Sequence, residues 1–104
     1  MKKYEIYLPL KYNDGTNIEP ENIKQIREDL VERFGALTVS SLSAPYQGTW
    51  NYGGVEFIDD IIKMEVIAFD DKNADDFFKK YKERLKALLR QIDILITVQD
   101  IHTI

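Results

Sequence analysis

The chain has 104 residues, a formal net charge of −4 at pH 7 and 44% hydrophobic residues, values that are typical of a folded globular domain and exclude a disordered chain. It contains no cysteine and one histidine, which excludes disulfides, thiolate metal sites and a multi-histidine metal site within one chain. We therefore expect no metal and no cofactor. The negative charge disfavours nucleic-acid binding. No apolar run reaches the roughly 18 residues of a membrane-spanning helix, and the N-terminal sequence lacks a signal-peptide pattern, so we expect a cytoplasmic protein without membrane contact.

The first half of the chain predicts a strand followed by a helix. Residues 3–12 alternate between the two faces of a strand, with one face apolar. Pro20 suits the first turn of a helix and Gly35 suits its C-terminal cap, so we predict a helix from about residue 20 to 34. The apolar stripe of this helix consists of Ile23, Ile26, Leu30 and Phe34.

The second half of the chain predicts three further strand segments and a second helix. Residues 36–42 are β-prone, and residues 47–54 indicate a loop or a hairpin that is rich in glycine and aromatic side chains. Residues 59–69 form a clear strand pattern. An apolar helical stripe follows from a cap at Asn73 to about Gln91, and the last strand is predicted over residues 92–104.

The order strand, helix, strand, strand, helix, strand predicts an α+β fold of the ferredoxin-like, split βαβ type. Right-handed crossovers place both helices on one face of a four-stranded antiparallel sheet. We predict one such domain over residues 1–104, in which the even-numbered side chains of the clear strands pack under the helices.

The opposite face of this sheet carries no helix and is about half apolar. A face exposed to water would be mostly polar, so we expect a second copy of the chain, as in a homodimer, or a folded-over segment such as residues 43–57 to cover it. A ligand cavity between the sheet and its cover is the functional alternative, and a nucleic-acid platform is disfavoured by charge. The expected interface residues are Tyr7, Ile61, Ile67, Phe69 and Leu95.

The candidate ligand-binding residues lie between the two central strand segments. Trp50 and Tyr52 belong to a glycine-rich stretch that predicts either a ligand lid or a hairpin packed on the sheet. Glu56, Asp59 and Asp60 follow closely, and such carboxylates can do acid–base chemistry or can simply form a solvated turn. They match no calcium-binding loop.

His102 is a weak candidate for a catalytic base, as is Asp59. A lone histidine beside a chain end is more often a surface residue, and a catalytic role requires a carboxylate such as Asp59 or Glu65 nearby.

The middle of the chain contains three linked features: RFGALTV at residues 33–39, GTW at residues 48–50, and two glycines followed by an acidic residue that enters a strand. This pattern resembles a family of small uncharacterised bacterial proteins, a domain of unknown function. The resemblance covers about the middle third of the chain. It implies a ferredoxin-like fold and brings no activity with it. The family's single acidic residue corresponds to Glu56, Asp59 or Asp60.

The function predicted from the sequence is a non-catalytic, self-associating binding or interaction module, to which another protein could also bind. The alternative is a small enzyme of the dimeric α/β-barrel type, which would work in a cavity at the open sheet face with His102 or a carboxylate as base. The enzyme hypothesis predicts an enclosed cavity with a buried titratable group. An RNA-binding module ranks third because of the negative charge.

Overall fold

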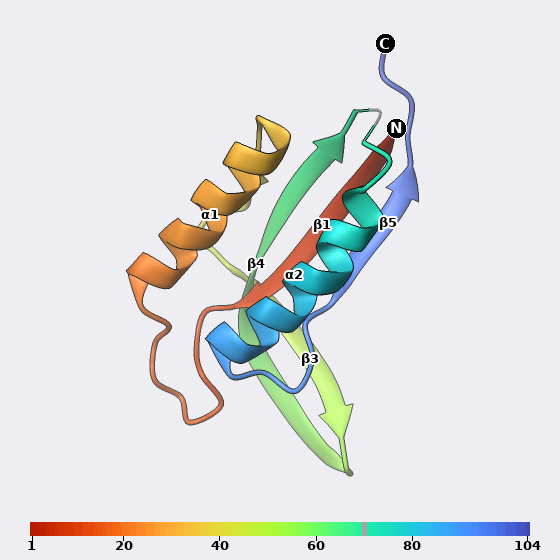
Figure 1. Cartoon of the computed structure of the whole chain (residues 1–104). Coiled ribbons are helices and arrows are strands. Elements are labelled where there is room, and N and C mark those ends of the chain that lie inside the picture. Colours follow the sequence, from red (N-terminus) through yellow and green to blue (C-terminus); the bar gives the residue numbers. More distant parts are fainter. Residues whose placement is uncertain (70) are drawn as a thin grey trace.

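A computed structural model of the chain, which describes residues 1–69 and 71–104, has a five-stranded antiparallel sheet with two helices on one of its faces (Figure 1). The strands of the main sheet follow the order β2-β4-β1-β5, and β3 pairs with β4 outside this path. This arrangement confirms the predicted ferredoxin-like α+β fold. In chain order the elements are β1 (Lys2–Pro9), α1 (Pro20–Phe34), β2 (Thr38–Val39), β3 (Tyr46–Tyr52), β4 (Val55–Ala68), α2 (Ala74–Leu89) and β5 (Ile96–Asp100).

The helix boundaries follow from local chemistry. α1 begins at Pro20 and ends at Phe34, as predicted, because Gly35 adopts a left-handed φ of 85° and donates its N–H to the Val31 carbonyl at 2.7 Å. α2 ends at Leu89, about two residues earlier than predicted. Arg90 takes the left-handed conformation there, with a φ of 52°, and stops the helix.

The core lies between the helices and the sheet. As predicted, the even-numbered side chains of β1 and of the second half of β4 are buried under the helices, since successive side chains of a strand point to opposite faces. The same prediction for the last strand is wrong, because in β5 Ile96 is only half-buried and Val98 is 49% exposed. Leu30 of α1 and Leu85 of α2 are fully buried against this layer. The buried strand residues are Tyr4, Ile6, Leu8, Ile62, Met64, Val66 and Ala68.

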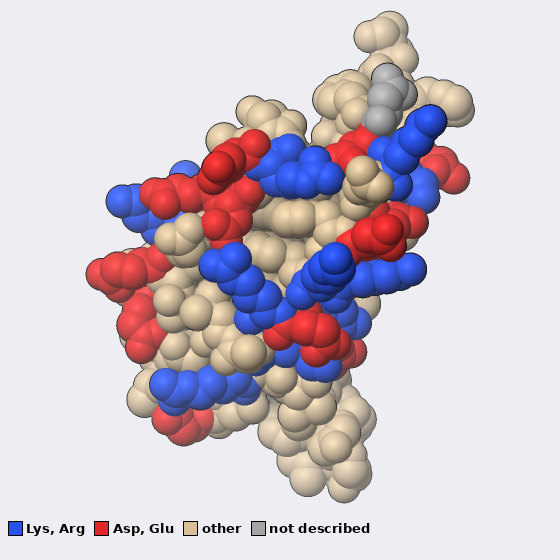
Figure 2. Space-filling view, in the orientation of Figure 1, with Lys and Arg blue, Asp and Glu red and all other residues tan. Residues whose placement is uncertain are grey.

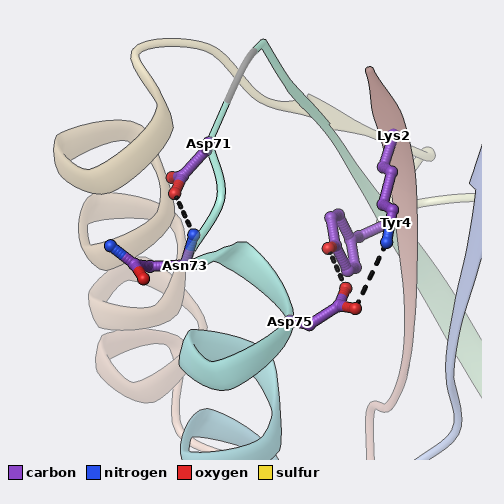
Figure 3. A network of polar contacts seen from close by, with 5 residues as sticks. All are labelled: Lys2, Tyr4, Asp71, Asn73 and Asp75. Atoms are coloured by element: carbon purple, nitrogen blue, oxygen red, sulfur yellow. Dashed lines mark hydrogen bonds and ion pairs between the residues drawn. The ribbon is translucent and has the colours of Figure 1, made fainter.

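A polar network joins β1 to the start of α2 (Figure 3). The Tyr4 hydroxyl and the Lys2 ammonium both donate to the Asp75 carboxylate in the first turn of α2. Just before the helix, Asp71 accepts a hydrogen bond from the Asn73 backbone N–H at 2.9 Å. The negative charge of Asp75 also lies where the helix dipole favours it. The network therefore satisfies the hydroxyl of a buried tyrosine.

Two predicted strands are shorter than expected. The first was predicted over residues 3–12, but β1 ends at Pro9, and the chain then turns through a loop. The last was predicted over residues 92–104, but only Ile96–Asp100 is a strand. The reason is pairing: Lys2, the first residue of β1, is the partner of Asp100, so residues after Asp100 find almost no neighbouring strand.

The segment predicted as a loop or hairpin is a hairpin. Gly53 and Gly54 have φ values of 60° and 80°, which suit a two-residue turn that requires positive φ at both positions, and they connect β3 to β4. β4 therefore begins at Val55 instead of residue 59, and β3 pairs with it as the fifth strand of the sheet, one more than the four predicted. Within the β-prone residues 36–42, only Thr38–Val39 form a strand.

The hairpin lengthens the sheet instead of folding over the open face. β1 pairs with β4 only from Ile61 onward, whereas β3 pairs with residues 55–61, so the hairpin projects beyond the helices (Figure 1). On the side drawn in Figure 2, the projecting part shows uncharged atoms, while the body mixes acidic and basic side chains. The expectation that residues 43–57 cover the open face is therefore wrong.

Candidate functional site

Large apolar side chains stand on the sheet face that the helices leave uncovered. Phe69 is 62% exposed and Leu95 is 57% exposed. Tyr7, Ile61 and Ile67 are half-buried at odd-numbered positions of β1 and β4, opposite to the core side chains. These are the five residues that the sequence placed at an interface. Exposed apolar area of this kind is uncommon in a monomer and is typical of surfaces that bind another molecule.

A pocket of about 590 Å³ opens on this face at the base of the hairpin. Its floor includes Tyr7 of β1 and Ile61 of β4. One wall is the hairpin, with Trp50, Tyr52 and Asp59. The other wall is the segment between α2 and β5, and the remaining lining residues are Pro9, Asn13, Gly48, Thr49, Gln91, Ile92, Asp93, Ile94 and Leu95. The volume is that of a site for a small molecule.

Gly48 shapes the floor of this pocket. It pairs with Asp59 across the hairpin, and the Ile61 side chain leans over it. A Cβ atom at Gly48 would lie 2.2 Å from Ile61 Cδ1, which is far inside van der Waals contact. Gly48 does not have a positive φ, so the constraint here is this close approach, which an alanine could relieve only through a shift of the Ile61 side chain.

Trp50 and Asp59 form the polar centre of the hairpin wall. The indole N–H of Trp50 donates to Asp59 Oδ2 at 2.7 Å. The indole ring stacks on Phe57, with ring centroids 4.7 Å apart and an interplanar angle of 22°. Asp59 is half-buried, while Trp50 remains 37% exposed. The carboxylate is thus held beside an aromatic surface that faces the pocket.

A charged cluster adjoins the pocket around Tyr7. The Tyr7 hydroxyl donates to Glu5 Oε2 at 3.0 Å, and this bond is the main reason that the pKa of the Glu5 carboxyl lies below its usual value and the pKa of Tyr7 above it. Lys63 Nζ lies 3.8 Å from Glu5 and 5.5 Å and 5.4 Å from the ring centres of Tyr7 and Tyr46. Glu5 therefore compensates the positive charge of Lys63.

The second carboxylate of the pocket is already paired. Asp93 Oδ1 lies 3.1 Å from the Lys82 ammonium of α2, and this contact is the main reason that the pKa of Asp93 is lowered. Asp93 also accepts the Ile94 backbone N–H at 2.9 Å. Its charge is therefore largely compensated, unlike that of Asp59.

The structure separates the three neighbouring acids that the sequence left as alternatives. Asp59 lines the pocket, whereas Glu56 and Asp60 occupy even-numbered positions on the other side of the hairpin and are exposed. Trp50 and Tyr52 lie with Asp59, as the proposed ligand-binding set required, but Glu56 does not join them.

His102 lies apart from this site. It is exposed in the segment after β5, which leaves the sheet at the end opposite to the hairpin (Figure 1). The structure therefore does not bring His102 and Asp59 together, and a catalytic role for either residue remains a prediction.

Sequence reasoning missed the wall formed by residues 91–95. Gln91 was expected at the end of the second helix and residues 92–95 in a regular strand, with Asp93 and Leu95 on its outer face. The structure instead ends α2 at Leu89 and begins β5 at Ile96, so that Gln91 and Asp93 reach the pocket from an irregular segment. The left-handed Arg90 that starts this segment has no sequence signal, because glycine or asparagine usually occupies such a position.

Within residues 1–69 and 71–104, the structure contains no cluster of three or more acidic or histidine side chains placed to hold a metal ion. Apart from Tyr4, Tyr12 and Tyr81, none of the polar or charged side chains described is buried. No helix among the described residues has both the length and the apolar character needed to cross a membrane.

Comparisons with known proteins identify the fold. No described protein family and no curated protein matches the sequence. A divalent cation tolerance protein, CutA1, from Thermus thermophilus is similar in structure, with a TM-score of 0.64 and 20% sequence identity over 99% of this chain and 86% of that one. A phage SAM lyase in the apo state is also similar, with a TM-score of 0.66 and 14% sequence identity over 94% of this chain and 78% of that one. The lyase has also been solved in complex with S-methyl-5′-thioadenosine.

The PII-like protein CutA from Nostoc sp. PCC 7120 gives a TM-score of 0.58 at 16% identity, over 97% of this chain and 81% of that one. Identities this low establish a shared ferredoxin-like fold and no more. The chain thus has the architecture of the CutA and PII-like proteins, while its resemblance to a family of uncharacterised bacterial proteins stays a prediction.

Proposed function

We propose that this chain is a non-catalytic, self-associating binding domain that takes up a small molecule at the pocket beside Trp50. The uncovered sheet face carries this proposal, because it combines exposed apolar side chains with a pocket of about 590 Å³. In this proposal residues 1–104 act as one cytoplasmic domain, and a second copy covers the open face, so that the pocket lies between the sheet and its cover.

Self-association follows from the apolar area that water would otherwise contact. Phe69 and Leu95 are both more than half exposed, and each large apolar side chain that becomes buried contributes about 1.5–3 kcal/mol. The projecting hairpin adds Tyr52 and its cross-strand partner Val55, which are 56% and 55% exposed. A homodimer through this face is the simplest closed assembly.

Sedimentation velocity over a range of protein concentrations tests the association. The wild type should sediment as an oligomer, and the double variant Phe69→Ser/Leu95→Ser should shift to the monomer. Val31→Ser is the matched control, because Val31 is 45% exposed on α1, away from the open face. A wild type that remains monomeric at high concentration contradicts the proposed association.

A small enzyme is the second candidate, and one comparison favours it. The phage SAM lyase has the same fold and was solved with S-methyl-5′-thioadenosine, so this fold can hold an enzyme with a nucleoside-sized ligand. The described residues around our pocket include no buried titratable group, which the enzyme hypothesis requires. A change in the fluorescence of the single tryptophan when that nucleoside is added would support the enzyme hypothesis.

A further inference from the structure

We infer that the pocket beside Trp50 selects small organic cations whose charge is surrounded by methyl or methylene groups, such as quaternary ammonium compounds. This inference rests on the proposed small-molecule site and does not depend on self-association. It follows from the charge and the aromatic surface of the pocket.

The pocket holds one carboxylate without a cationic partner. Asp59 accepts the Trp50 indole N–H at 2.7 Å, and among the described residues no lysine or arginine lies within ion-pair distance of it. Asp93 is paired with Lys82 at 3.1 Å. The pocket therefore presents a net negative charge, which attracts a cation and repels phosphates and carboxylates.

Aromatic rings stand next to this charge. Phe57 stacks on Trp50 and holds the indole in place, while Trp50, Tyr7 and Tyr52 line the pocket. Indole and phenol faces attract cations, and the attraction is greatest for a weakly hydrated charge that loses little solvation on binding. A compact, strongly hydrated ion such as a metal would need several oxygen ligands, and the described residues offer no such cluster.

Basic side chains do not cancel this preference. No lysine or arginine is among the described residues that line the pocket. Lys63 lines the adjoining groove, where Glu5 lies 3.8 Å away and the Tyr7 and Tyr46 rings flank its ammonium group. The protein already uses two aromatic rings and a carboxylate around this lysine, which is the arrangement that we assign to the pocket ligand.

Choline and its neutral isostere 3,3-dimethyl-1-butanol test the inference, because they differ in charge but hardly in shape. The single tryptophan gives one indole N–H resonance, and its shift in NMR titrations of the full chain reports binding at the wall of the pocket. We expect choline to bind roughly tenfold more tightly than the neutral alcohol, and benzoate to bind more weakly than either.

Variants separate the charge from the shape of the site. Asp59→Asn keeps an acceptor for the indole N–H but removes the charge, so its affinity for choline should fall to that for the alcohol. Asp60→Asn is the matched control, because it removes the same charge from the other side of the hairpin, and it should behave like the wild type. Asp59→Glu should retain a preference for choline, which keeps the test valid if the asparagine variant is unstable.

The outcomes distinguish this inference from the proposed function. Equal affinity for choline and the alcohol, or equal loss in the Asp59→Asn and Asp60→Asn variants, overturns the cation preference but leaves a small-molecule pocket. If no probe shifts the indole resonance and no nucleoside does so either, both the inference and the proposed ligand site fail.

Discussion

Replacing Gly48 by alanine tests how closely the hairpin packs around the pocket. Alanine in place of glycine ordinarily stabilises a strand by about 0.5–1 kcal/mol. Here the new methyl group would lie 2.2 Å from Ile61 Cδ1 and 3.3 Å from Ile61 Cγ1. An extra methyl group in an occupied space costs about 1–3 kcal/mol. The cost exceeds the gain by about 0–2.5 kcal/mol, so we expect Gly48→Ala to destabilise the hairpin by up to about 2.5 kcal/mol.

Ile61→Val provides the internal check, because it removes the Cδ1 atom that the methyl group would strike. In the Ile61→Val background, Gly48→Ala should be neutral or stabilising, so the two substitutions should be coupled by about 1 kcal/mol or more. Hydrogen exchange of the β3 and β4 amides measures the local stability of the hairpin. Urea denaturation followed by Trp50 fluorescence measures the free energy of unfolding of the whole domain. A stabilising Gly48→Ala in the wild type, or an unchanged penalty in the Ile61→Val background, would refute the packing argument.

Four further substitutions test the fold. Gly35→Ala should lower the free energy of unfolding by about 1–2 kcal/mol, because alanine resists the left-handed conformation; a neutral result in urea denaturation would contradict this. Leu85→Ala should cost about 2–5 kcal/mol in the same assay, and a negligible loss would place Leu85 outside the core. The hydrogen bond from Arg33 is the main cause that lowers the pKa of Asp71. The stability that the charged Asp71 contributes is therefore present above its unfolded-state pKa and is lost as the pH falls below about 4. Asp71→Asn should flatten the acid side of a Tm–pH curve. Burial chiefly raises the pKa of Tyr4, so the stability that its neutral form contributes is lost as the pH rises above about 10; Tyr4→Phe should lessen that alkaline loss, and an unchanged curve would count against it.

The sequence predicted the fold where independent signals agree. α1 was placed with both ends correct because Pro20 and Gly35 mark its limits and the apolar stripe lies between them. The ends of β1 and β5 were misplaced because Tyr12 and Ile94 are buried without belonging to a strand. Apolar periodicity reports burial, whereas a strand also requires a paired neighbour, which a single sequence does not reveal.

The candidate site was predictable in part. Trp50, Tyr52 and Asp59 were grouped from their proximity in the sequence, and the hairpin indeed places them on one wall. Choosing Asp59 over Asp60 required the register, which the turn at Gly53 and Gly54 fixes. The wall opposite could not be predicted, because it depends on where α2 stops and on how the chain returns to the sheet.

The single strand β4 belongs to two zones of different expected rigidity. From Ile61 to Ala68 it has a neighbour in β1 and lies beneath both helices, whereas from Val55 to Asp59 the only strand paired with it among the described residues is β3. A two-stranded ribbon alone is marginally stable in water, so this arm should open and close many times for each unfolding of the body. Trp50 lies on this two-stranded ribbon, so a molecule that binds against Trp50 would also hold the ribbon closed.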